Sequence, residues 1–542
     1  MKNLINYFLL GFLVIGTMSS CTKNFKDFNT DPNRAQDRDL DFDNLRIGSL
    51  ISQMQAKIIP SQNLAENADV NNYQLIYNLM GDIYSGHMGA SNAFGNNGRN
   101  NTTYQMVPGW YGAAFPYAYQ NHMAPWYKVK TVANKLGIGA RSTYAIAQIL
   151  KVMAMHKLTD IYGPLPYLNF VPATSVPYNS QQEIYNSFFL ELDSSISALQ
   201  STIKDVGNQS KSLAAYDMIY KGNLSKWLKF ANSLKLRLAM RIVYADAAKA
   251  KKYAEEAVGS GVFISNDDNA ILQVNGSTTL NPLYIIGYSY NDTRMGATME
   301  SFLKGYKDPR IQLLFNQGTD NLAGDYRGIR NGSLFNGQAY KPFSNLNITV
   351  NTPIQWMTAA ELYFLRAEGA IRGWAMNGTA KDLYESGVKS AFSMPLGGGQ
   401  RQAGDATTYL NNDQDKPTAY VDPMTQSNNF KGTPTSPLST ITIKWNEQDN
   451  FERKLERIIT QKWIALFPDG QEAWTEFRRT RYPRVIPVAN NFSGGTINTD
   501  LQIRRSPFPQ SEYQNNNKNV TAGVALLNGP DNGGTKLWWD KK

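Results

Sequence analysis

The sequence has very little cysteine, little histidine and few long apolar runs. Of its 542 residues only Cys21 is a cysteine, and only His87, His122 and His156 are histidines. A lone cysteine excludes a disulfide framework within the chain. The three histidines have no metal-ligand spacing, and we expect His156 to be a core residue of an apolar helix. Beyond the amino-terminal segment, no stretch is long and apolar enough to predict a transmembrane helix.

Catalytic motifs are also missing. The chain has no G-x-S-x-G elbow and no P-loop. Residues 137–142 begin like a dinucleotide-binding loop but lack its third glycine. Alternating aspartates at 37–43 resemble the start of a calcium loop, but Phe42 and Gly48 stand where an EF-hand needs Gly and Glu. We therefore predict no cofactor and no metal site, while a hydrolytic carboxylate pair placed by the fold stays an alternative.

Charge is modest and spread along the chain. There are 54 Lys and Arg against 44 Asp and Glu, a formal net charge of +10. The one dense basic cluster is Arg478, Arg479, Arg481 and Arg484, which we interpret as a solvated helix end with some ion pairing. Scattered charge of this kind does not indicate a nucleic-acid partner.

The amino terminus has the pattern of an export signal. Lys2 precedes the apolar run Tyr7–Ile15, which is too short to span a bilayer, and two serines lead into Cys21. This ending is typical of bacterial lipoproteins, in which the cysteine is acylated after cleavage. We predict a signal peptide at residues 1–20 and a lipid-anchored mature chain, 21–542, forming a single domain. The alternative is an ordinary signal or anchor with a chance thiol.

Apolar residues at helical spacing predict a mostly α fold. They fall into about four helix-turn-helix pairs of tetratricopeptide-like size, separated by long irregular insertions. Short strands are expected at Ala270–Val274 and near Ile441–Lys444, with no large sheet. The predicted pairs are a helix around Ile146–Met153 with Gln181–Leu199, Trp227–Ile242 with Ala247–Val258, Trp356–Ala367 with Ala380–Phe392, and Glu452–Phe467 with Asp469–Arg479.

Aromatic residues make up 12% of the chain, with 30 Tyr and 10 Trp, and two insertions combine them with amides. Rings stack on the C–H faces of sugars and amides bind hydroxyls, so these loops predict a ligand-binding face. The same rings would accept a peptide, whose carboxylate could bind Arg294, and ordinary packing of loop aromatics is the alternative. The candidate residues are Asn96, Arg99, Asn100, Tyr104 and Trp110 in the first insertion, and Tyr288, Tyr290, Asn291 and Arg294 in the second.

An ordered set of segments gives the chain a family resemblance. With the Cys21 signal, the chain resembles the SusD/RagB family of outer-membrane nutrient-binding lipoproteins. The segments are Phe25–Asn33, Leu158–Tyr167, Trp227–Arg241, Met357–Glu368, Ile459–Phe467, Arg504–Pro509 and Trp538–Asp540.

The resemblance implies a helical scaffold with a ligand-binding face of loops. It also implies a glycan or peptide ligand, a SusC-like TonB-dependent transporter as partner, placement on the extracellular side of the outer membrane, and no catalysis. A lipid-anchored hydrolase and a scaffold that binds only protein remain the competing hypotheses.

Overall fold

The computed structural model describes residues 45–61, 68–95, 98–136, 140–172 and 175–542. The predicted signal, Cys21 and Asn96 lie outside the described residues. The chain divides into two units, residues 1–46 and 47–542, and the description below concerns the second.

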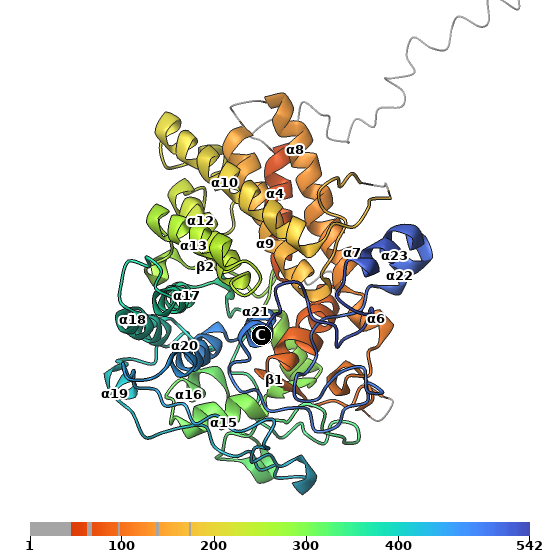
Figure 1. Cartoon of the computed structure of the whole chain (residues 1–542), viewed down its shortest axis with the longest axis vertical. Helices are drawn as coiled ribbons and strands as arrows, with labels where there is room; N and C mark the ends of the chain where they lie inside the picture. Colours follow the sequence, from red (N-terminus) through yellow and green to blue (C-terminus); the bar gives the residue numbers. More distant parts are fainter. Residues whose placement is uncertain (1–44, 62–67, 96–97, 137–139, 173–174) are drawn as a thin grey trace, which may run out of the picture. The chain divides into compact units, whose positions relative to one another are not determined.

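Four helical hairpins form the scaffold, as the periodicity predicts, so the prediction of a mostly α fold is confirmed. The two helices of each pair pack together, and successive pairs meet through contacts of α10 with α12, α12 with α17 and α17 with α20 (Figure 1). The pairs are α9 (Arg141–Tyr162) with α10 (Gln181–Val206), α12 (Leu224–Arg241) with α13 (Ala247–Ser260), α17 (Ala359–Ile371) with α18 (Ala380–Ser393), and α20 (Phe451–Leu466) with α21 (Gly470–Thr480).

Side-chain caps fix where many of these helices begin. Ser180 and Glu183 form a reciprocal capping box at the start of α10. At five other helices an N-cap side chain accepts a hydrogen bond from the backbone N–H three residues on, which satisfies a donor that the helix leaves unpaired. These caps are Asn223 of α12, Asp246 of α13, Thr379 of α18, Asn450 of α20 and Asp469 of α21.

Two predicted elements differ in the structure. Trp356 lies on strand β4 (Ile354–Met357), and the third hairpin begins only at Ala359. Residues 441–444 form no strand, although Ile441 and Ile443 are buried. The carbonyls of Ile441 and Ile443 accept hydrogen bonds from the hydroxyls of Tyr306 and Tyr384, so side chains replace a neighbouring strand.

The described strands form two small antiparallel sheets. β2 (Ala270–Leu272) pairs with β4 in the register Ala270↔Met357, Ile271↔Gln355 and Leu272↔Ile354, which confirms the first predicted strand. β1 (Met88–Ala90) pairs with β3 (Thr293–Met295) in the register Met88↔Met295, Gly89↔Arg294 and Ala90↔Thr293.

Short helices and irregular segments make up the rest. No helix of the described residues has both the length and the apolarity to cross a membrane. The remaining helices are α4 (Leu45–Ile58), α5 (Ala68–Tyr73), η2 (Gln74–Asp82), η4 (Asn101–Thr103), α6 (Pro108–Tyr111), α7 (Ala114–Ala118), η5 (Tyr119–Met123), α8 (Ala124–Leu136), α11 (Lys211–Ala214), η7 (Asn266–Asp268), α14 (Pro282–Tyr284), η8 (Ile285–Ser289), α15 (Ala297–Gly305), α16 (Ile311–Leu314), η9 (Asp320–Leu322), α19 (Thr407–Leu410), η10 (Gln426–Asn428), α22 (Gln510–Asn515) and α23 (Asn517–Ala525).

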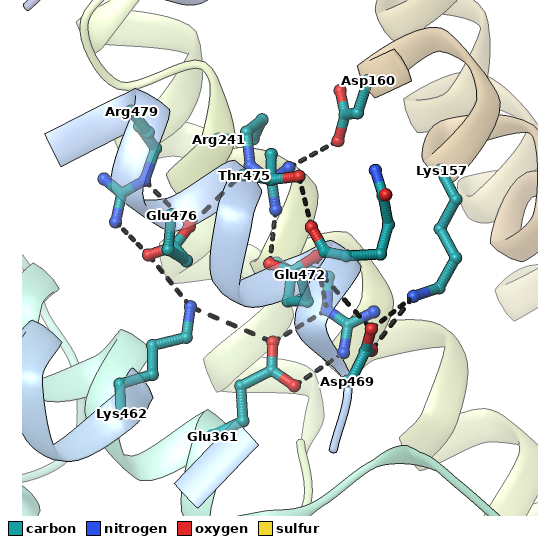
Figure 2. A network of polar contacts seen from close by, with 12 residues as sticks. Lys157, Asp160, Arg241, Glu361, Lys462, Asp469, Glu472, Thr475, Glu476 and Arg479 are labelled. Atoms are coloured by element: carbon teal, nitrogen blue, oxygen red, sulfur yellow. Dashed lines mark hydrogen bonds and ion pairs between the residues drawn. The ribbon is translucent and has the colours of Figure 1, made fainter. Parts of the chain in front are cut away.

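A buried network of ion pairs joins the four hairpins, with α21 at its centre (Figure 2). Arg237 of α12 binds Glu361 of α17 through two hydrogen bonds of 2.6 and 2.7 Å. Arg241 pairs with both Asp160 of α9 and Glu472 of α21. Since these side chains are buried, each charge depends on its partner for stabilisation.

The second half of the network lies along α21. Arg479 binds Glu368 of α17 at 2.6 Å and Glu476 at 2.6 Å, and Lys462 of α20 lies 3.1 Å from Glu476. Burial alone would raise the pKa of Glu368, but Arg479 and Arg372 outweigh it and hold this pKa below its ordinary value.

The interpretation of the basic cluster as solvated is therefore wrong for Arg478 and Arg479, which are fully buried. Arg478 donates to the backbone carbonyls of Asp160 and Arg504. These two arginines face inward because carboxylates and carbonyls of the protein bind their guanidinium groups. Most of these partners lie far away in the sequence.

Candidate functional site

The two loops predicted to bind a ligand meet in the structure, because β1 and β3 bring their ends side by side. The Asn92 amide donates to Asp292 at 2.7 Å, and the Ser91 hydroxyl donates to the carbonyl of Asn291 at 2.7 Å. Gln74 of η2 donates to the other carboxylate oxygen of Asp292. Residues some 200 positions apart in sequence are thus held together.

In the first loop, two of the predicted residues are buried and shape the backbone. The Asn100 side chain accepts from the N–H of Thr102 and donates to the carbonyl of Ala93. Tyr104 is only 2% exposed and adopts the left-handed conformation, with φ of 64°. Burial raises the pKa of Tyr104, so its hydroxyl remains neutral.

The exposed part of the first loop is built around Trp110. Its half-buried ring packs edge-on against Phe94, with ring centroids 5.4 Å apart. Arg99 is exposed and its guanidinium lies over the ring of Phe492, 4.7 Å from the centroid. Phe94, which sequence reasoning missed, therefore belongs to the aromatic surface of this loop.

The second loop carries three half-buried tyrosines on and beside η8. Tyr284 and Tyr288 stack with centroids 4.8 Å apart. The Tyr288 hydroxyl donates to the carbonyl of Leu346 at 2.6 Å and accepts from Asn316, so this ring is fixed in place. Gln338 donates to the carbonyl of Tyr290, and neither the Tyr284 nor the Tyr290 hydroxyl has a hydrogen bond among the described residues.

Arg294 lies beneath the second loop and is only 3% exposed. Its guanidinium donates to the carbonyls of Lys341, Gly287 and Thr293 and to the side chain of Asn291. Burial lowers its pKa to about 10, so it stays protonated at neutral pH. With these donors bound to the protein itself, Arg294 and Asn291 hold the loop rather than present a free cation.

Other chemistry-bearing groups are buried in the scaffold. His156 is fully buried, as predicted, and burial lowers the pKa of His122 to about 4, so His122 is neutral. Among the described residues, no group of three His, Cys, Asp or Glu side chains is arranged to hold a metal ion. Apart from the guanidinium of Arg99, the accessible features of the site are rings and amides, which suit recognition of an uncharged ligand.

Both a family model and solved structures of known proteins match this chain. The family model described as "SusD-like: Susd and RagB outer membrane lipoprotein" matches residues 27–540. No curated protein matches the chain.

Solved structures are similar over nearly the whole chain. A chitin-binding SusD homolog from Flavobacterium johnsoniae is 41% identical, with a TM-score of 0.83, covering 92% of this chain and 99% of that one. SusD homologs from Bacteroides vulgatus and Bacteroides thetaiotaomicron are each 35% identical, with TM-scores of 0.84 and 0.83 and the same coverage.

Proposed function

The chain belongs to the SusD-like family of outer-membrane lipoproteins, and we propose that it binds a neutral glycan and delivers it to a transporter without catalysing a reaction. The observation that carries this proposal is the meeting of two aromatic loops across β1 and β3. The chitin-binding homolog from Flavobacterium johnsoniae supports a glycan as the ligand class.

The half-buried rings would supply most of the contact area through their accessible faces. Trp110 with Phe94 and Tyr290 with the Tyr284–Tyr288 pair present apolar faces to which the C–H faces of sugar rings can stack. Asn100, Tyr104, Asn291 and Arg294 would act by holding the loops in place, since their polar groups contact the protein or are buried. We assign Arg99 to the rim of this surface, and Asn96, outside the described residues, stays a predicted ligand contact.

A peptide is the second candidate ligand, because aromatic rings accept peptides as well. A peptide carboxylate would need an available cation, and the four hydrogen bonds of Arg294 to the protein count against that role. The buried carboxylates of α21 are paired with arginines or lysines, which fits a scaffold better than a hydrolase.

The anchor and the partner belong to the same proposal. Acylation of Cys21 would tether the mature single-domain chain to the outer membrane, facing outward, with a SusC-like TonB-dependent transporter beneath it. Mass spectrometry of the mature protein should find an acylated Cys21 as its first residue. Co-purification from membranes should recover a transporter of this class, and its absence would remove the delivery step.

Ligand binding is tested with the mature chain lacking its anchor cysteine. We expect measurable affinity for neutral oligosaccharides, including chitooligosaccharides, and about a tenfold loss for Trp110→Ala or Tyr290→Ala. Trp374→Ala is the matched control, because Trp374 is also half-buried but lies just after α17. Equal affinity of all three variants, or binding of peptides alone, would contradict the proposal.

A further inference from the structure

A cavity of about 560 Å³ opens beside the second aromatic loop, and none of the ligand-binding residues predicted from the sequence lines it. Its walls come from η7 and β2, from the segments at 281–283, 347–355 and 393–402, and from Phe467 and Pro468. The volume lies within the range of small-molecule sites. Tyr288 borders this region, since its hydroxyl binds the carbonyl of Leu346, next to the lining residue Asn347.

Amide side chains dominate the polar lining of the cavity. Among the described residues that line the cavity, Asp267 is the only charged side chain and there is no Lys, Arg or His, although the chain as a whole has a net charge of +10. The amides are those of Asn266, Asn269, Gln273, Asn281, Asn347, Asn351, Gln355, Gln400 and Gln402.

Some of these amides maintain the fold. The Asn269 side chain accepts from the N–H of Ala359 and donates to Asn266. Asn281 donates to the carbonyl of Thr352 and caps α14 by accepting from the N–H of Leu283. These groups shape the wall and are not counted as ligand contacts.

Asn266 is also fully bonded within the protein, since it donates to Ser390 and Ser393 and accepts from Asn269 and Ser390. Several of the remaining amides keep hydrogen-bonding capacity for a ligand. Gln355 donates to the carbonyls of Leu466 and Phe467, and Asn347 donates to that of Gln312, which leaves both side-chain oxygens as acceptors. At the exposed rim, the side chains of Gln273, Asn351 and Gln402 make no hydrogen bond with the described residues, and each offers a donor and an acceptor.

We propose that this cavity is a second binding site, for a neutral, hydroxyl-rich ligand of one or two sugar units. A hydroxyl both donates and accepts, as an amide does, so the two match in pairs. Leu283, Leu314 and Phe467 add an apolar part of the wall for the C–H face of a sugar. The inference goes beyond the proposed function, because it does not depend on the exposed rings of the two loops.

The absence of basic side chains from the lining decides against anionic ligands. A uronic acid, a sulfated sugar or a peptide carboxylate would enter without a counter-charge, and burying an unpaired charge is costly. Asp267 is the one carboxylate among the described lining residues, so a divalent cation here would depend mainly on neutral amide oxygens and water.

The test uses disaccharides as probes and two sets of variants of the mature chain. Binding of N,N′-diacetylchitobiose and of cellobiose is measured by calorimetry and by ligand-observed NMR. The double variant Gln273→Ala/Gln402→Ala removes two rim amides that hold no part of the fold, and Gln182→Ala on the exposed face of α10 is its matched control.

We expect the double variant to weaken binding of at least one disaccharide fivefold or more, while Gln182→Ala stays within twofold of the wild type. No disaccharide binding, equal affinity of the double variant, or a loss confined to Trp110→Ala would overturn the second site. The proposed function is tested separately by the affinity of Trp110→Ala for longer oligosaccharides. It fails if this affinity equals that of the wild type.

Discussion

The hairpin scaffold and the ligand face use opposite kinds of polar chemistry. In the scaffold, fully charged side chains are buried and paired around α21 (Figure 2). In the loops and the neighbouring cavity, the exposed groups are mainly rings and amides. The buried ion pairs therefore join helices of the scaffold, and the net charge of +10 says little about the ligand.

The largest expected effect comes from removing a buried cation. Arg479→Met would leave Glu368 and Glu476 without their closest partner and should lower the free energy of unfolding by about 3–5 kcal/mol. Chemical denaturation measures this. Lys381→Met is the control, because Lys381 pairs with Glu385 at the exposed surface and its loss should cost less than about 0.5 kcal/mol. Equal losses for the two variants would show that burial does not distinguish these pairs.

A smaller effect is expected at Arg294, a buried cation that lies beneath the second loop. Arg294→Gln removes donors to three buried or half-buried carbonyls and should lower the free energy of unfolding by about 1–3 kcal/mol. Denaturation and ligand titration on the same variant separate the two roles of this residue. An unchanged stability together with complete loss of peptide binding would make Arg294 a ligand-binding cation instead.

Sequence reasoning recovered the scaffold because helical periodicity is local. The helix faces of Trp227 to Leu238 and of Leu455 to Ile459 can be read within a few turns, and both are buried. The spacing of Trp356 to Ala359 and Ala360 fits a helix, so the sequence predicts that Trp356 is helical. In the structure Trp356 lies on β4, and this strand depends on pairing with the distant strand β2.

The site was less predictable because its partners are distant in sequence. The positioning role of Arg294 rests partly on Lys341, and the inward orientation of Arg479 rests on Glu368, 111 residues away. The cavity amides extend from Asn266 to Gln402, with no local pattern to mark them. Composition indicated an aromatic binding surface, but only the fold shows which rings are exposed.

Asp82, at the end of η2 and beside α21, offers a pH-dependent test of how strictly buried charges are paired. No cation of the described residues lies close to this buried carboxylate, and burial raises its pKa to about 7 from an ordinary 3.8, despite hydrogen bonds that lower it. A raised carboxyl pKa means that the folded state binds the proton more tightly than the unfolded state does. The contribution of Asp82 to the free energy of unfolding therefore falls as pH rises from about 4 to about 7.

Asp82→Asn should therefore stabilise the protein at pH 8 by up to about 4 kcal/mol relative to its effect at pH 4. Thermal denaturation at the two pH values measures the difference. Asp246→Asn is the control of opposite sign, because the backbone N–H of Lys249 lowers the pKa of Asp246. The same Tm difference at both pH values would contradict a titrating Asp82.

The smallest effect is expected from salt. If the ligand face recognises neutral sugars, raising the salt concentration from 0.05 to 0.5 M should change oligosaccharide affinity by less than about twofold, because screening acts on charge pairs. Calorimetry at the two concentrations checks this. A steep loss of affinity with salt would show that charged groups such as Arg99 contribute directly to binding.

The central claim, that the two aromatic loops form one glycan-binding surface, is tested most directly by a crystal structure of the mature chain with a neutral oligosaccharide. We predict sugar rings stacked on Trp110 and on Tyr290, spanning the loops that β1 and β3 join. An oligosaccharide bound away from both rings, with the two loops uncontacted, would contradict the account.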